Sequence, residues 1–158
     1  MSETEPVAGN GSSTGGRHSA EEVVVDFLLA LARYDVDTAL DLVAEDIEYI
    51  NVSLPTVHGR EALERIARPF LRPGRMGFDV HFNHVATEGD DVVITDRVDE
   101  LSVRRFAACF WVYGRFTVRD GKIAVWRDSF DWFDVTIGTL RGLLGLFVPS
   151  LNRTLPPA

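Results

Sequence analysis

The chain has 158 residues, 46% of them hydrophobic, and a formal net charge of −8. One domain is the simplest interpretation of this length, which suffices to bury a core. The acidic balance argues against a nucleic-acid partner, because phosphate binding needs clustered Lys and Arg. The single cysteine, Cys109, excludes an internal disulfide and fits a reducing compartment. No apolar run reaches the roughly 18 residues of a membrane span and no signal pattern is present, so we expect a cytoplasmic protein.

The N-terminal residues 1–18 are rich in Ser, Gly and Thr and predict a disordered tail, followed by a single domain over 19–158. A G-x-S-x-G sequence at 11–15 matches the nucleophile turn of serine hydrolases, but no strand precedes it, so we interpret it as linker. The ordered part begins at Ser19, which forms an S-x-x-E capping box with Glu22. Apolar residues then follow with helical spacing, namely Val23, Val24, Phe27, Leu28 and Leu31.

Further helices are predicted at about 37–44 and at about 60–70, the latter ending near Pro69 and Pro73. Strands are predicted at about 46–52, 76–87, 91–104, 105–118 and 122–130, with turn signals at Gly89-Asp90 and Asp120-Gly121. The apolar tail over 135–148 predicts a helix that lies over the sheet or in a dimer contact. This order indicates an α+β fold, in which a curved mixed or antiparallel sheet of about four to six strands wraps around the N-terminal helices and leaves a deep apolar pocket.

Polar residues recur at strand positions two apart, which face the same side of a sheet. Arg97 and Asp99 form one such pair, Tyr49 and Asn51 form another, and Asp128 shares a face with its apolar neighbours in the last strand. A guanidinium can hold two carboxylates, and a carboxyl pair with separated pKa values can act as acid and base. A phenol and an amide facing that pair would fix a water molecule. A structural ion pair on the sheet remains the alternative interpretation.

Metal and cofactor sites are not indicated. His81 and His84 lie three apart on a predicted strand and should face opposite sides, and there is no H-E-x-x-H or cysteine cluster. Cys109 lies in an apolar strand and should pack as a small hydrophobe. Gly142 and Gly145 do not follow a strand with the spacing of a dinucleotide fingerprint. We therefore expect no cofactor and no metal.

Three segments together resemble the limonene epoxide hydrolase family: Tyr49-x-Asn51, Asp96-Arg97-Val98-Asp99 and Trp126-Arg127-Asp128-Ser129-Phe130-Asp131. The resemblance extends from about Glu21 to Phe133, and the apolar tail looks especially like mycobacterial members of that family. It implies the cystatin-like cone shared with nuclear transport factor 2 and ketosteroid isomerase. It also implies an epoxide hydrolase, with a place in detoxification or lipid metabolism.

The resemblance also implies a role for each polar residue. Asp99 would be the general acid that protonates the epoxide oxygen, and Asp128 the general base that deprotonates the attacking water. Arg97 would bridge the two carboxyls, and Tyr49 and Asn51 would hold the water. The product would be a vicinal diol, formed in one step without a covalent intermediate or a cofactor.

The family's substrate-binding positions fall on mostly apolar residues, which suit a terpene- or sterol-like epoxide. They are Leu28, Leu31, Met76, Phe78, Leu101, Phe110, Val112, Phe130 and Val135. His81 departs from the pattern, since an apolar residue is expected there. The fold's usual pairing through the sheet implies a homodimer. Two alternatives on the same fold stay open, an isomerase or polyketide cyclase and a binding module for a lipophilic ligand.

Overall fold

The computed structural model describes residues 18–151 and 155, so the predicted tail and the motif at 11–15 lie outside it, apart from His18. The helices are α1 (Ala20–Ala32), α2 (Val36–Asp41), α3 (Arg60–Phe70) and α4 (Trp132–Gly145), with a short 3₁₀ helix, η1 (Pro149–Leu151). The strands are β1 (Val43–Asn51), β2 (Val57–His58), β3 (Gly77–Glu88), β4 (Val92–Val103), β5 (Phe106–Arg119) and β6 (Lys122–Phe130). None of the described helices is long and apolar enough to cross a membrane.

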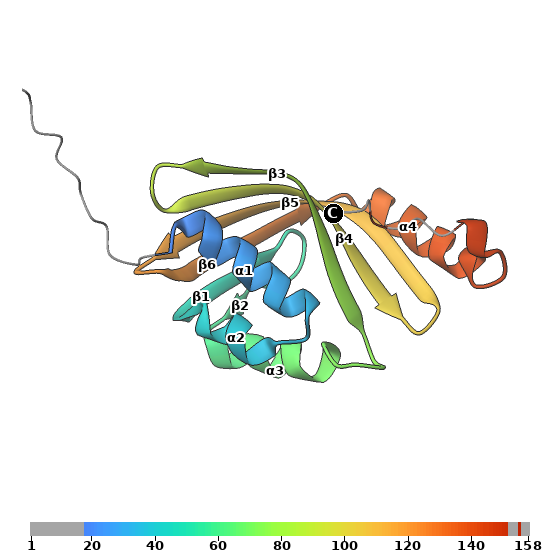
Figure 1. Cartoon of the computed structure of the whole chain (residues 1–158), viewed down its shortest axis with the longest axis horizontal. Helices are drawn as coiled ribbons and strands as arrows, with labels where there is room; N and C mark the ends of the chain where they lie inside the picture. Colours follow the sequence, from blue (N-terminus) through green and yellow to red (C-terminus); the bar gives the residue numbers. More distant parts are fainter. Residues whose placement is uncertain (1–17, 152–154, 156–158) are drawn as a thin grey trace, which may run out of the picture.

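One six-stranded sheet organises the fold, with the strand order β2-β1-β6-β5-β4-β3. β1 runs parallel to β6, and the other neighbouring strands are antiparallel. The sheet curves around α1, with α2 and α3 on the same side, while α4 lies at the far end beside the β4–β5 hairpin (Figure 1). The predicted α+β class with a curved mixed sheet is confirmed.

Helix α1 supplies much of the core on the concave side of the sheet. Its start follows the predicted capping box, in which the Ser19 N–H donates to Glu22 Oε2 (2.7 Å) and the Glu22 N–H donates to Ser19 Oγ (3.2 Å). The core joins its apolar face to residues from the strands, including Val23, Val24, Phe27, Leu28, Ile47, Val93, Phe116 and Ile123. Burial of this face, rather than helix propensity, holds α1 in place.

A β-bulge in β3 changes the faces of its histidines. Phe82 pairs with Arg97, but the next paired residue is His84 with Asp96, so Asn83 is the extra residue. An extra residue reverses the alternation of faces beyond it. His81, which pairs with Val98, and His84 therefore lie on the same convex side of the sheet. The prediction that they face opposite sides was wrong.

The other differences from the predicted elements lie at their ends. α2 stops at Asp41 because Val43 already pairs with Ile123 as the start of β1. α3 has the predicted bounds, since it ends at Phe70 and includes Pro69 in its last turn. The two-residue strand β2, which pairs with Glu48 and Tyr49 of β1, is too short to give a periodic signal and was not predicted.

Helix α4 covers an edge of β5 that β6 leaves unpaired. The β5–β6 ladder reaches only Val112 opposite Phe130, and the chain then turns into α4. The edge N–H of Trp111 donates to Asp134 Oδ2 at 2.8 Å. A Cβ at Gly138 would lie 2.6 Å from the Cys109 carbonyl oxygen, and one at Gly142 would overlap the Ala107 carbonyl. Glycines at this spacing let the helix approach the strand backbone, so α4 lies beside an edge of the sheet rather than over one of its faces.

Candidate active site

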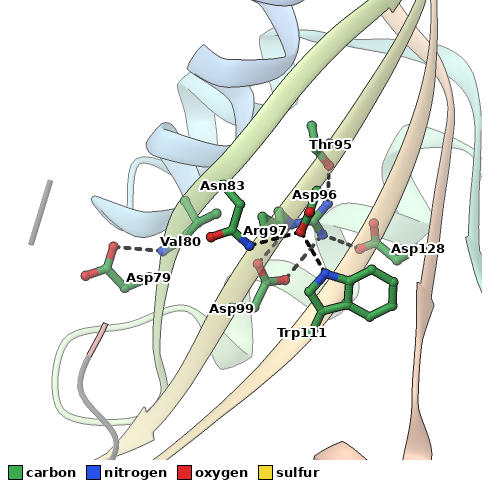
Figure 2. Close-up of polar contacts among 9 residues, drawn as sticks. All are labelled: Asp79, Val80, Asn83, Thr95, Asp96, Arg97, Asp99, Trp111 and Asp128. Carbon is green, nitrogen blue, oxygen red and sulfur yellow. Dashed lines mark hydrogen bonds and ion pairs between the residues drawn. The ribbon is translucent and has the colours of Figure 1, made fainter. Parts of the chain in front are cut away.

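Arg97 lies at the centre of a polar cluster on the concave side of the sheet and is 0% exposed. Its Nε donates to Asp99 Oδ1 (2.9 Å), and its Nη2 donates to Asp99 Oδ2 (3.2 Å) and to Asp128 Oδ2 (2.8 Å). Its Nη1 donates to Thr95 Oγ1 at 2.9 Å. Figure 2 shows the guanidinium between the two carboxyls. The structure thus brings together the two carboxyls and the arginine that the sequence singled out.

The strand register explains how residues far apart in sequence meet. Thr95 pairs with Gly114, Gly114 pairs with Asp128, and Asp128 pairs with Asn51. Directly paired residues point to the same face, so this row runs across four strands on the concave side. The parity of each strand was readable from the sequence, whereas the parallel contact between β1 and β6 was not.

Gly114 is a site residue that the sequence reasoning missed. A Cβ there would overlap Arg97 Nη1 and lie 2.5 Å from Thr95 Oγ1. The missing side chain therefore provides the space in which the guanidinium crosses β5 towards Asp128. An isolated glycine within a predicted strand was the available signal, since such a glycine often marks a close approach.

Tyr49 and Asn51 face the carboxyl of Asp128 from β1. The Tyr49 ring stacks on Trp126, with centroids 3.9 Å apart and an interplanar angle of 29°. Among the described residues, Trp126 Nε1 and Asp128 Oδ1 are buried and have no hydrogen-bond partner of normal geometry. The indole nevertheless lies close enough to the Asp128 carboxyl to lower its pKa, against the larger effect of burial. One group is a donor and the other an acceptor, so both can also hydrogen-bond to a small polar molecule in the cavity that they line. The sequence analysis assigns no role to Trp126.

Burial controls the protonation of the two carboxyls. Asp99 is 6% exposed and Asp128 is 5% exposed. Burial raises the pKa of Asp99 to about 6, against the opposing effect of the Arg97 charge. It also raises the pKa of Asp128, again opposed by Arg97. One guanidinium can neutralise only one of two buried carboxylates, so the pair tends to retain a proton.

The remaining polar groups keep their ordinary charge at neutral pH. Burial, followed by the nearby Asp128 charge, raises the pKa of Tyr49, so its phenol stays protonated. Burial disfavours the Arg97 cation, but the charges of Asp128 and Asp99 outweigh it and raise the pKa of Arg97. The site therefore contains one permanent cation, two coupled carboxyls and a neutral phenol. Of these groups, the two carboxyls can donate and accept protons near neutral pH.

A cavity of about 380 Å³ opens onto these groups. Its lining consists of Leu31, Tyr49, Asn51, Leu71, Phe78, Asp99, Leu101, Phe110, Val112, Trp126, Asp128, Phe130, Trp132, Val135 and Thr139. Of the predicted substrate-binding residues, Leu28 does not line it, because this side chain is fully buried in the core, and Met76 lines a neighbouring cavity instead. Leu71, Trp132 and Thr139 were not predicted. The α4 residues among them could be found only once the place of that helix was known.

Comparisons with known proteins show the family of this chain. The family model of the limonene-1,2-epoxide hydrolase catalytic domain matches residues 18–141. Epoxide hydrolase EphG of Mycobacterium tuberculosis is 40% identical over 129 residues, which are 82% of this chain and 85% of that protein. The chain belongs to the limonene epoxide hydrolase family. The family resemblance read from the sequence is thereby confirmed.

Solved structures place this family member among related folds. A limonene epoxide hydrolase-like enzyme of M. tuberculosis has a TM-score of 0.81 at 38% identity, covering 86% of this chain and 95% of that one. A protein of Catenulispora acidiphila with a ketosteroid isomerase-like fold has a TM-score of 0.64 at 16% identity, covering 75% and 92%. The second likeness concerns the fold alone.

Proposed function

We propose that the protein is an epoxide hydrolase that adds water to a lipophilic epoxide and releases a vicinal diol. The observation that carries the proposal is the buried Arg97 bridging Asp99 and Asp128 at the wall of an apolar cavity, in a chain of this family. A neutral, strained ring needs a base to activate water and an acid to protonate the leaving oxygen. The two carboxyls supply both functions.

In the proposed reaction, the Asp128 carboxylate takes a proton from water while the water oxygen bonds to one ring carbon. The bond from that carbon to the ring oxygen breaks, and the Asp99 carboxyl transfers its proton to the departing oxygen. The diol leaves, Asp99 ends ionised and Asp128 ends protonated. One proton then returns from Asp128 to Asp99, directly or through solvent, to restore the starting state. Each proton transfer is typically worth on the order of 10²–10⁴-fold in rate.

The assignment of acid and base follows the family resemblance. A single proton on the pair is supported by the contacts of Arg97 with both carboxyls and by burial, which raises both pKa values. In a coupled pair the observed pKa values belong to both groups together. Arg97 remains charged throughout and stabilises whichever carboxyl is ionised.

Tyr49, Asn51 and Trp126 would position the attacking water. The phenol and the amide lie beside Asp128 in the register of β1 with β6. The buried indole N–H of Trp126 can donate to the water oxygen while Asp128 Oδ1 accepts a water proton. Holding the nucleophile in one geometry removes much of the entropic cost of the reaction.

The substrate is proposed to be a terpene- or sterol-like epoxide, because most of the cavity lining is aliphatic or aromatic. The reaction needs no cofactor. The proposal places the enzyme in the cytoplasm, in line with the single cysteine, and in lipid metabolism or detoxification.

A homodimer that pairs through the convex side of the sheet is part of the proposal. Trp111 and Tyr113 lie on that side and are 43% and 37% exposed, and Phe133 of the adjacent α4 is 71% exposed. Large exposed aromatic residues of this kind are typical of interfaces. Light scattering coupled to gel filtration measures the mass of the protein in solution. A monomer at micromolar concentration would contradict the proposed homodimer.

The deciding experiment is a single turnover in H₂¹⁸O with enzyme in excess over lipophilic epoxides. Incorporation of ¹⁸O into the diol in the wild type supports direct attack by water. Diol formation should be lost in Asp99→Asn and in Asp128→Asn. Unlabelled diol would mean that an enzyme oxygen was transferred and the one-step mechanism is wrong. A folded protein that binds epoxides without converting them would favour the binding-module or isomerase alternatives.

A further inference from the structure

The segment over residues 60–75, which consists of α3 and most of the loop towards β3, is basic although the chain as a whole is acidic. It contains five arginines and two glutamates, whereas the whole chain has a formal net charge of −8. The arginines are Arg60, Arg65, Arg68, Arg72 and Arg75. Charges on a protein surface act within about 8 Å at physiological ionic strength, so this segment attracts anions locally in spite of the net charge.

Three of these arginines are exposed and form no ion pair among the described residues, namely Arg65, Arg72 and Arg75. The other two form the ion pairs Arg60–Glu45, Arg68–Asp37 and Arg68–Glu64. The charge of the first three is therefore not neutralised within this part of the chain and is available to an anionic partner.

Two of the available guanidiniums are held at the C-terminal end of α3. Arg72 Nε donates to the Arg68 carbonyl oxygen (2.8 Å), and Arg75 Nη1 donates to the Pro69 carbonyl oxygen (3.5 Å). The last carbonyls of a helix have no partner within the helix and carry partial negative charge, which favours cations there. Each guanidinium uses one N–H in these bonds, so its other N–H groups can bind an external anion beside Phe70.

The apolar stripe of α3 continues from the core to the surface beside these cations. Leu63 is buried, whereas Ile66 and Phe70, on the same helix face, are 42% and 53% exposed. Isolated exposed apolar side chains are common, but here they lie next to three arginines without acidic partners. A helix that combines an exposed apolar stripe with arginines is typical of proteins that lie on a membrane interface.

The combination of groups distinguishes a lipid surface from other anionic partners. A nucleic acid would bind the cations but leave Ile66 and Phe70 in water. An anionic bilayer presents headgroup phosphates directly above hydrocarbon, so it can bind the guanidiniums and bury the two apolar side chains at the same time.

We propose that residues 60–75 dock the protein on the surface of an anionic lipid bilayer. Ile66 and Phe70 enter the interface, and Arg65, Arg72 and Arg75 contact the headgroup phosphates. The segment lies on the concave side of the sheet, so a homodimer through the convex side leaves it exposed (Figure 1). For the proposed hydrolase, such docking would place the enzyme at the phase in which a lipophilic epoxide dissolves. The docking itself does not depend on the proposed reaction.

Sedimentation of the whole chain with lipid vesicles tests the proposal. The wild type should bind vesicles of phosphatidylcholine and phosphatidylglycerol in equal parts, should bind phosphatidylcholine alone much less, and should be released as ionic strength rises. Combining Arg72→Gln with Arg75→Gln should lower the partition coefficient by about 25-fold, roughly fivefold for each arginine. Circular dichroism checks that the variants are folded.

The matched control combines Arg104→Gln with Arg105→Gln, which removes the same charge from the exposed turn between β4 and β5. Binding of this control should stay within about a factor of two of the wild type, because the turn is distant from the docked segment. Equal losses in the two double variants, equal binding to neutral and anionic vesicles, or no binding to either would overturn the proposal. So would binding to an RNA homopolymer without binding to vesicles.

A second measurement tests which side chain enters the lipid. Bromine atoms on lipid acyl chains quench the fluorescence of an indole that contacts them. Quenching by brominated anionic vesicles should be greater in Phe70→Trp than in the wild type. Phe147→Trp is the control, because Phe147 is 85% exposed beyond the end of α4, at the other end of the molecule, and should add no quenching (Figure 1). Quenching that increases only in Phe147→Trp would show that the other end docks and would overturn the proposal.

Discussion

Two aspartates of β4, three residues apart, show how the two faces of one strand differ. Asp99 lies on the concave side, 6% exposed, against Arg97. Asp96 lies on the convex side, where its Oδ1 accepts from Asn83 Nδ2 (2.9 Å) and Trp111 Nε1 (2.7 Å). Figure 2 shows both aspartates with their partners. The first has a raised pKa of about 6, and the second has a lowered pKa.

The difference shows that a cationic neighbour alone does not decide the proton affinity of a carboxyl. Asp99 contacts a guanidinium, yet burial outweighs it and raises the pKa. Asp96 has neutral donors, the Asn83 amide first and the Trp111 indole second, and near solvent these lower its pKa. The same residue type in one short segment thus gives a carboxyl with a raised pKa on one side and a carboxyl with a lowered pKa on the other.

The largest expected effect separates the two aspartates by activity. Asp99→Asn should lower kcat by roughly 10²–10⁴-fold, because the amide cannot deliver a proton. Asp96→Asn should keep activity within about a factor of two, since it faces away from the cavity. Steady-state kinetics with a lipophilic epoxide measures both, and circular dichroism checks folding. Comparable losses of kcat in the two variants would contradict the proposed functional difference between the concave and convex faces of β4.

A second test disturbs the concave side without changing a charge. Gly114→Ala places a methyl group where Arg97 Nη1 lies, so the guanidinium must move away from Asp128. We expect a loss of about 1–3 kcal/mol in the free energy of unfolding, as for overpacked cores, together with lower kcat. Thr95→Val is the control, because it keeps the volume and removes only the acceptor for Nη1. Denaturant titration and kinetics provide the measurements, and an unchanged Gly114→Ala enzyme would contradict the steric argument.

The dependence on pH should have opposite sign for the two aspartates. The native pKa of Asp99, about 6, exceeds its ordinary value of 3.8, so the stabilisation from this carboxyl is complete at low pH and is lost as pH rises through about 6. The pKa of Asp96 is lowered, so its contribution is present above 3.8 and is lost as pH falls through the native value. The difference in unfolding free energy between the wild type and each Asn variant should show the slope of the carboxyl that the variant lacks.

The dependence of activity on pH should follow the titration of Asp99 and not that of Asp96. A general acid must hold its proton, so kcat/KM should fall as pH rises through the pKa of the coupled pair, which lies near 6 for Asp99. The profile of Asp96→Asn should coincide with that of the wild type. A profile that is flat across this range would exclude the buried pair as the source of the proton.

The smallest expected effect concerns the convex side. His84 Nδ1 lies 3.6 Å from Asp96 Oδ2, and the His84 side chain is 82% exposed. His84→Ala should change the free energy of unfolding by less than about 0.5 kcal/mol and leave kcat/KM unchanged. A large loss of activity would show that the two faces of β4 are coupled.

The sequence predicted the parts of the site that depend on alternation within one strand. Arg97 with Asp99, and Tyr49 with Asn51, share faces because successive strand residues alternate. Alternation cannot locate an extra residue, so the sequence did not reveal the bulge at Asn83. For this reason His81 and His84 were wrongly predicted to face opposite sides. Nor can it tell which strands are neighbours, so the parallel β1–β6 contact and the need for Gly114 emerged only in three dimensions.

The place of β1 in the sheet has a consequence for how the chain matures. β1 is made early, yet it sits between β2 and β6, and β6 ends only at Phe130. The growing chain therefore leaves one side of β1 unsatisfied until the last strand is synthesised and docks. Contacts so distant in sequence form slowly, and exposed strand edges favour aggregation in the meantime. Because Asn51 meets Asp128 in that same docking step, a chain acquires its reactive centre only on becoming fully folded.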